Sequence, residues 1–115
     1  MEQKPSEKTY TFFENVYAVV RLIPTGKVTN YGSIAKYLGT GLSSRMVGWA
    51  MNAAHAVKPK VPAHRVVNRN GMLTGRLHFA TPTLMAELLQ KEGIIIQKDT
   101  VINYKQHYWN PSEEL

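Results

Sequence analysis

Four histidines are the side chains best suited to acid–base or metal chemistry in this chain of 115 residues: His55, His64, His78 and His107. Their spacing matches no metal-binding pattern such as H-x-x-x-H, so the sequence predicts no metal site and no cofactor. The chain has no cysteine, which excludes disulfides, thiolate metal sites and a thiolate nucleophile. The chemistry to be expected is therefore recognition by charge and hydrogen bonding.

The distribution of charge points to a phosphate-bearing partner. The net charge is +6, and residues 15–86 contain no Asp or Glu. The basic residues of this stretch are Arg21, Lys27, Lys36, Arg45, Lys58, Lys60, Arg65, Arg69 and Arg76. A basic stretch between mixed ends is typical of nucleic-acid binding, although a basic protein that binds any polyanion would look similar. The basic residues are not gathered on one amphipathic helix, so we expect no membrane partner.

Length and hydropathy favour a single domain. The composition is 43% hydrophobic and 19% charged, which suits one domain with a real core. No apolar run approaches the ~20 residues needed to cross a bilayer, and the polar N-terminus carries no secretory signal. We therefore expect a cytoplasmic monomer, associated with the nucleoid if the source is bacterial.

Two short helices around a glycine-containing turn are predicted within residues 29–54. The candidate caps are Thr29 or Asn30 for the first helix, which runs to about Leu38, and Ser43 or Ser44 for the second. Gly39-Thr40-Gly41 supplies the turn. The second helix has small neighbours around an arginine, so the pair is typical of a helix-turn-helix, although any helix hairpin would give a similar pattern.

The rest of the chain completes an α+β fold that is mainly α. Further helices are predicted over 9–23, ending at Pro24-Thr25-Gly26, and from Thr81-Pro82, as cap and first residue, to Gly93. Extended runs are expected at 27–29, 66–67, 94–96 and 101–102, and the aromatic segment 104–109 is expected to dock on the core. The domain is predicted to span 9–110, between a disordered N-terminus, 1–8, and a tail, 111–115.

Five motifs stand in an order typical of one protein family. They are Gly26-Lys27-Val28-Thr29-Asn30-Tyr31, Ser44-Arg45-Met46-Val47-Gly48, Pro62-Ala63-His64-Arg65-Val66-Val67, Gly71-Met72-Leu73-Thr74-Gly75 and Leu88-Leu89-Gln90-Lys91-Glu92-Gly93. Together they resemble the DNA-binding domain of the O6-alkylguanine DNA alkyltransferases, whose active-site run is Pro-Cys-His-Arg-Val. The resemblance covers roughly residues 16–93. It implies a helix-turn-helix whose second helix enters the minor groove, beside a short extended active-site-like segment.

The departures from this family are equally informative. Ala63 stands where the alkyl-accepting cysteine is found, and Arg76 where active members have a tyrosine. The Gly-Gly that usually follows is replaced within Leu77-His78-Phe79-Ala80. This combination resembles the alkyltransferase-like proteins, which bind alkylated guanine without repairing it and many of which carry tryptophan at the cysteine position.

The resemblance implies a DNA-binding set that consists of Tyr31, Ser44, Arg45, Gly48 and Arg69. Arg45 would be the finger that fills the hole left by a flipped nucleotide, with a plain phosphate contact as the alternative. Tyr31 would press on the phosphate 3′ of the target, or else be a core tyrosine. Trp49 either packs in the core or widens the minor-groove surface. Further phosphate contacts are expected from Lys27, Lys36, Lys58 and Lys60.

A lesion pocket is implied beneath residues 62–67, the altered active-site run, with Pro62, Ala63, His64, Val66 and Arg76 as its residues. Ala63 would give room for an O6 group, or be neutral filler. Arg76 would stack on the flipped base or donate to it, or be a surface loop arginine. His64 and Glu92 resemble the remnant of a Cys-His-Glu relay and are interpreted as a structural hydrogen bond, while Arg65 would tie loops together from inside.

The function implied is that of a non-enzymatic DNA damage sensor. It would bind duplex DNA, flip O6-alkylguanine into the pocket and mark the lesion for nucleotide excision repair proteins. A helix-turn-helix transcriptional regulator is the main alternative. An active DNA alkyltransferase is a second, which the lack of cysteine opposes.

Overall fold

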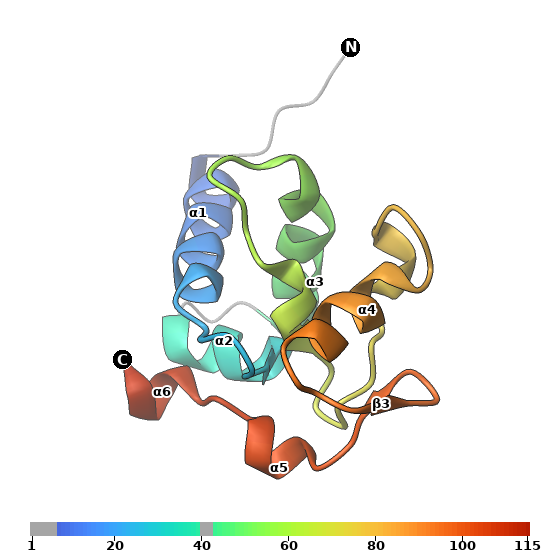
Figure 1. Ribbon diagram of the computed structural model, residues 1–115. Coiled ribbons are helices and arrows are strands. Elements are labelled where there is room, and N and C mark those ends of the chain that lie inside the picture. The colour runs from blue at the N-terminus through green and yellow to red at the C-terminus, as the bar shows by residue number, and fades with distance from the viewer. Residues whose placement is uncertain (1–6, 40–42) are drawn as a thin grey trace.

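The computed structural model describes residues 7–39 and 43–115 as a mainly helical α+β fold, as predicted (Figure 1). Its α-helices are α1 (Glu7–Arg21), α2 (Tyr31–Leu38), α3 (Ser44–Ala53), α4 (Leu84–Lys91), α5 (Tyr104–His107) and α6 (Pro111–Glu114). The strands are β1 (Thr29–Asn30), β2 (Val66–Val67), β3 (Ile96–Gln97) and β4 (Thr100–Val101). Three 3₁₀ turns complete it: η1 (Ala54–Ala56), η2 (Ala63–Arg65) and η3 (Arg76–His78).

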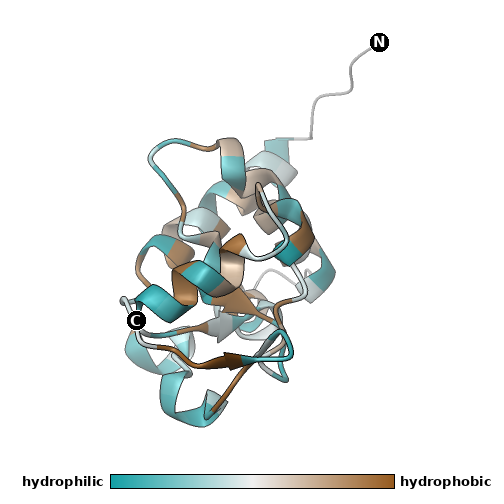
Figure 2. Ribbon diagram, turned by 45° about the vertical axis from the view of Figure 1, so that its right-hand side comes forward, coloured by the Kyte–Doolittle hydropathy of each residue, from teal (hydrophilic) through white to brown (hydrophobic). Residues whose placement is uncertain are grey.

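Helix α1 packs against both α2 and α3. Its buried stripe of Phe12, Val16, Val19 and Val20 follows helical spacing, and Figure 2 shows the matching alternation of hydrophobic and hydrophilic stretches along the helices. The Tyr17 hydroxyl donates to a backbone carbonyl of α3, 2.9 Å away. The helix starts two residues before the predicted position 9, at Glu7.

The helix-turn-helix is formed by α2 and α3. Asn30 is the cap of α2, since its side chain accepts a hydrogen bond from the Ser33 N–H at 2.8 Å. Gly39 ends α2 in the left-handed region, with φ of 59°; the other two residues of the predicted turn, 40 and 41, lie outside the described residues. Ser43 precedes α3 without a side-chain capping bond.

A two-residue parallel pairing brings the altered run alongside the start of α2. Thr29 pairs with Val66 and Asn30 with Val67. The C-terminal segment docks beside them, as predicted: Val28 bridges to Tyr108, and the Trp109 N–H donates to the Val28 carbonyl at 2.8 Å. Residues 111–115, predicted as a tail, include helix α6.

The predicted start of the fourth helix, with Pro82 as its first residue, was wrong by two residues. Residues 81–83 form a turn closed by a hydrogen bond from the Leu84 N–H to the Thr81 carbonyl, and α4 begins at Leu84. Thr83 precedes the first turn and donates its hydroxyl to Glu87 at 2.7 Å, so Pro82 lies in the turn and not in the helix. The end was predicted correctly, with Gly93 in the left-handed region at φ of 88°.

Candidate nucleic-acid interface

A shallow hollow of about 430 Å³ runs along the exposed face of α3. It is lined by Tyr31, Ser44, Arg45, Gly48, Trp49, Asn52, Thr74, Gly75 and His78. Three elements therefore meet there: the start of α2, the outward side of α3 and the loop that leads into η3. Four of the five predicted DNA-binding residues are brought together in this hollow.

The register of α3 explains which side chains face the hollow. Val47, Ala50 and Met51 are buried in the core. At 100° per residue, Arg45, Trp49 and Asn52 fall on the opposite side of the helix, where all three are exposed. Trp49 is 51% exposed, which rules out the core-packing interpretation left open by the sequence.

Tyr31 connects α2 to the loop across the hollow. Its hydroxyl lies 3.4 Å from the Thr74 hydroxyl. A Cβ at Gly75 would lie only 3.2 Å from the Tyr31 hydroxyl, so glycine permits this close approach. The ring packs partly against the core, so Tyr31 combines a buried body with a hydroxyl at the interface.

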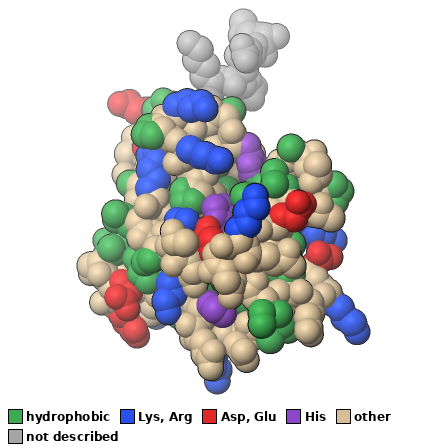
Figure 3. All heavy atoms as spheres, in the orientation of Figure 1, with side chains coloured by type: hydrophobic (Ala, Val, Ile, Leu, Met, Phe, Trp, Pro, Cys, Tyr) green, Lys and Arg blue, Asp and Glu red, His purple; other side chains and the backbone are tan. Residues whose placement is uncertain are grey.

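Arg69, the fifth predicted residue, lies in a neighbouring hollow. This depression of about 230 Å³ is lined by Tyr31, Gly32, Ser44, Asn68 and Arg69. Because Tyr31 and Ser44 line both depressions, the two form one continuous surface. On the face seen in Figure 3, Lys and Arg side chains are spread widely, while acidic side chains form a few small groups.

A separate cavity of about 240 Å³ lies beside the altered run. Ala63 and His64 line it, together with Ala54, His55, Lys60, Val61, His78, Phe79, Ala80, Leu84 and Leu88. The rings of His55 and Phe79 meet edge to face, 4.5 Å between centroids. Burial, and then the nearby His78, lower the pKa of His55. His78 lines this cavity and the α3 hollow, so the two spaces adjoin.

The remaining predicted pocket residues lie elsewhere. Val66 is buried in the core, 1% exposed, and Pro62 precedes η2 without lining the cavity. The Arg76 Nε lies 3.4 Å from the Asp99 carboxylate, and another guanidinium nitrogen donates to the Leu73 carbonyl at 3.3 Å. This directs Arg76 away from the cavity lining, and its role at a flipped base stays a prediction.

Residues absent from the predicted set also shape the site. His55, His78 and Phe79 line the cavity, beside Lys60, which was expected only as a phosphate contact. Asn52 lines the hollow, beside Trp49, whose place at the interface the sequence had left open. Helical spacing from Arg45 would have identified Trp49 and Asn52, four and seven residues further on. For His78 the signal was the replaced Gly-Gly, but nothing local in the sequence shows that its side chain lies between two spaces.

The Glu92 carboxylate is the hub that holds the altered run in place. It accepts hydrogen bonds from His64 Nε2 at 2.6 Å, from Arg65 Nε and its terminal nitrogen at 3.1 and 3.0 Å, and from the Gly26 N–H at 2.8 Å. Its side chain is 10% exposed. Burial raises the pKa of Glu92, but the bonds from Arg65, Gly26 and His64 outweigh it and lower that pKa to about 2. The carboxylate is therefore ionised and fully engaged.

The contacts predicted for His64 and Arg65, whose side chains both donate to Glu92, are confirmed. The hydrogen bond between His64 and Glu92 is present. Arg65 also donates to the Ile23 carbonyl at 2.9 Å and to the Thr25 hydroxyl at 3.0 Å, so it ties loops together from inside. Burial lowers the pKa of His64, partly offset by its bond to Glu92. His64 is thus held neutral and oriented.

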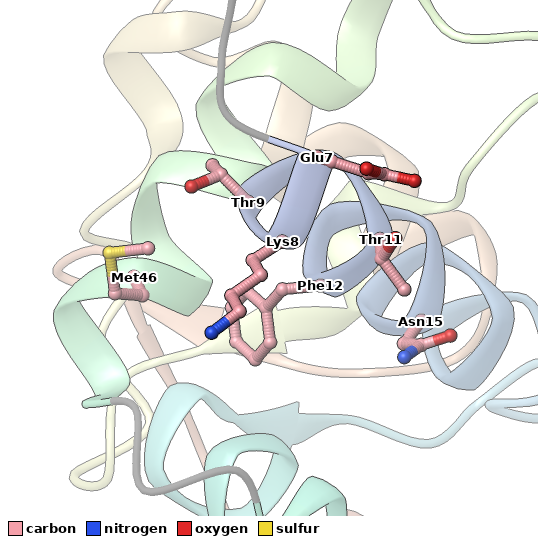
Figure 4. A pocket seen from close by; sticks show the side chains of 7 residues that line it. All are labelled: Glu7, Lys8, Thr9, Thr11, Phe12, Asn15 and Met46. Atoms are coloured by element: carbon pink, nitrogen blue, oxygen red, sulfur yellow. The ribbon is translucent and has the colours of Figure 1, made fainter.

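A larger hollow, about 680 Å³, lies away from all of these residues. It is lined by Glu7, Lys8, Thr9, Thr11, Phe12, Asn15 and Met46 (Figure 4). These side chains come from the first half of α1 and from α3 and include none of the predicted site residues. The mixture of one acid, one base, one amide and two hydroxyls offers no convergent chemistry, so size does not make it the candidate site.

Comparison with known proteins identifies the family. The family model for the DNA-binding domain of 6-O-methylguanine DNA methyltransferase matches residues 11–94. The chain belongs to this family. Alkyltransferase-like protein 1 of Schizosaccharomyces pombe is 36% identical over 104 residues, which cover 87% of this chain and 95% of that relative. A DNA base-flipping protein of Escherichia coli is 31% identical over 111 residues, which cover 95% and 82%.

A methylated-DNA–protein-cysteine methyltransferase of Salmonella typhimurium is 45% identical over 86 residues. The match covers 74% of this chain but only 48% of that protein, so the chain spans about half of such relatives. Among solved structures, S. pombe Atl1 in complex with damaged DNA containing O6-carboxymethylguanine superposes with a TM-score of 0.76 at 33% identity. That match covers 95% of this chain and 98% of the other.

No helix within 7–39 and 43–115 has the length and apolar character needed to cross a membrane. Over the same residues, no three His, Asp or Glu side chains are close enough to hold a metal ion.

Proposed function

We propose that this protein binds duplex DNA, rotates an O6-alkylguanine out of the helix and holds it in the cavity beside Ala63. The observation that carries this proposal is the junction at His78, which lines both the α3 hollow and the cavity. A base leaving the DNA at Arg45 would therefore enter the cavity without crossing the core. Family membership and the damaged-DNA complex of Atl1 support the same function.

Arg45 and Tyr31 divide the work of flipping in this proposal. Arg45 is exposed at the start of α3, where its long cationic side chain enters the base stack and hydrogen-bonds the orphaned partner base. The half-buried Tyr31 presents a rigid hydroxyl that presses on the adjacent phosphate. Flipping costs a few kcal/mol and costs least for a damaged base, so lesions are favoured over normal guanine.

The bound lesion is held and not repaired. Alkyl transfer requires a thiolate, and a chain without cysteine contains none. Ala63 contributes a methyl group to the cavity wall. His64 and Glu92 are engaged in the hub, which leaves the pair as a frame for the pocket. This assigns the chain to the non-enzymatic members of its family.

A stable complex with an unrepaired lesion is useful only as a signal. We therefore infer that nucleotide excision repair proteins recognise this complex on chromosomal DNA. Excision of the lesion strand by purified excision-repair proteins should be faster with this protein than without it. An unchanged or slower excision rate would contradict the handover.

Paired duplexes give the decisive test of lesion recognition. Two labelled duplexes that differ by one O6-methylguanine are titrated by fluorescence anisotropy at one salt concentration. We expect at least tenfold tighter binding of the damaged duplex, and no radiolabelled methyl group on the protein afterwards. Equal affinity for both duplexes would refute lesion sensing, and a preference for one undamaged sequence would favour the transcriptional regulator.

A further inference from the structure

Trp49 is unusual because an indole faces water on an otherwise polar surface. The chain has two tryptophans. Trp109 is 7% exposed and belongs to the core, whereas Trp49 is 51% exposed. None of the ring–ring contacts among the described residues involves Trp49. A single exposed hydrophobic side chain needs no special explanation, so the case for Trp49 depends on the residues around it.

The position of Trp49 restricts what it can touch. It lies four residues after Arg45, so the two side chains share one face of α3, a single turn apart. Both line the same hollow, as do Tyr31 and His78 from other elements. Two glycines, Gly48 and Gly75, also line it, which leaves open space around the indole.

We propose that Trp49 is a second DNA-inserting residue, which packs its indole face against a base exposed in the step that Arg45 opens. This inference rests on the proposed function and adds a residue that determines how tightly the damaged DNA is bound. Lysine or arginine would bind phosphates better than an indole, whose large flat face gains most from stacking on a base or sugar. Apolar wedges beside a cationic side chain are a common means of opening base steps from the minor groove. Stacking is tolerant of sequence, which suits recognition of a lesion in any context.

Intrinsic fluorescence tests the contact directly, because the two tryptophans differ in environment. In a Trp109→Phe variant, Trp49 is the only tryptophan. Saturation with the O6-methylguanine duplex should quench its emission and protect it from acrylamide. In the matched Trp49→Phe variant, Trp109 should show little change. Unaltered emission and acrylamide quenching of Trp49 in the saturated complex would overturn the proposal.

Affinity provides the second measurement, which does not depend on the folding of the Trp109 variant. Loss of one base–aromatic stack predicts that Trp49→Ala weakens binding of the damaged duplex by about 5- to 150-fold. Trp49→Phe, which keeps a flat ring, should retain most of the affinity. Leu22→Ala is the matched control, since Leu22 is also exposed, at 56%, but follows α1. It should leave binding unchanged.

The pattern of losses separates this inference from the proposed function. The loss for Trp49→Ala should be larger with the damaged duplex than with the undamaged one. Equal losses on both duplexes, or no loss, would overturn the stacking role while the wild-type preference for the lesion stays intact. If the wild-type protein shows no such preference, the proposed function itself fails.

Discussion

Replacing Glu92 by glutamine should destabilise the fold substantially. Glutamine has nearly the same shape, but it removes the negative charge that faces Arg65. Its amide N–H group would also face the N–H groups of Arg65, His64 and Gly26, which are themselves donors. The pKa of Glu92 is lowered from 4.5 to about 2, and a carboxyl with this change contributes about 3 kcal/mol of stability at neutral pH. Breaking a largely buried ion pair, here 16% and 10% exposed, costs about 3–5 kcal/mol. We therefore expect a loss of about 3 kcal/mol at pH 7, or roughly 10–15 °C in Tm.

The pH dependence of this loss is a sharper test than its size. The folded-state pKa of Glu92 lies below the unfolded value, so its contribution is complete above about pH 4.5 and is lost as pH falls toward 2. Burial lowers the pKa of His64, so protonation of this residue also reduces the free energy of unfolding as pH falls below 6.5. This range overlaps the range over which Glu92 titrates. The comparison is therefore made in a His64→Gln background, which keeps a donor at this position but does not titrate. The difference between His64→Gln and the double variant with Glu92→Gln should fall from about 3 kcal/mol at pH 7 to near zero at pH 2.

Urea unfolding followed by circular dichroism measures these free energies. Glu87→Gln is the control, because Glu87 lies on the exposed side of α4 and its loss should cost under about 0.5 kcal/mol. Lesion binding by the folded Glu92→Gln protein should stay within about threefold of wild type. Wild-type stability for Glu92→Gln, or a difference that does not change with pH, would refute the hub. Normal stability with lost lesion binding would move Glu92 from the frame to the pocket.

Two further predictions concern the DNA interface and its support. Arg45→Ala should weaken binding of the damaged duplex by at least tenfold more than Lys58→Ala does. Lys58→Ala should weaken binding of both duplexes alike and lower the slope of log K against log salt by about one. Equal effects of the two variants in anisotropy titrations would exclude the finger role of Arg45. Asn30→Ala should cost about 1–2 kcal/mol in urea unfolding, because it removes the cap of α2 and a 3.0 Å hydrogen bond to the Tyr104 hydroxyl. Asn30→Asp keeps the cap and should recover about half of this loss, and an equal loss in both variants would show that the cap contributes nothing.

The helix-turn-helix could be predicted because its signals are local. Asn30 caps a helix that starts at the next residue, and Gly39 ends it in a conformation that favours glycine. The buried face of α3 follows from helical spacing alone. The start of α4 was misplaced because Thr81 and Thr83 flank Pro82, and either could precede the helix. The hydrogen bond from the Leu84 N–H to the Thr81 carbonyl closes a turn over residues 81–83, so the helix begins after Thr83.

The hub and the junction of the two spaces could not be predicted from spacing. Gly26 and Glu92 are 66 residues apart in sequence, and the pairing of Thr29 with Val66 joins segments that share no local pattern. The position of His78 between the hollow and the cavity depends on the path of the loop around it. Trp49 shows a different limit of prediction from sequence. Its hydrophobicity favours burial, and only the register of α3 shows that it faces outward.

The geometry around position 63 explains why alanine is tolerated there. The backbone of the run is fixed by bonds from the Ala63 N–H to the Val61 carbonyl at 2.8 Å and from the Arg65 N–H to the Pro62 carbonyl at 3.0 Å. Neither bond depends on the side chain at 63. The neighbouring side chains of His64 and Arg65 are held by Glu92 and by the loop at 23–25, not by any group on residue 63. A methyl group in place of a thiol therefore removes the nucleophile and leaves the frame of the cavity intact. In the proposed function, recognition is separable from alkyl transfer because the bond between His64 and Glu92, which would orient a base toward a thiol, forms without any group on residue 63.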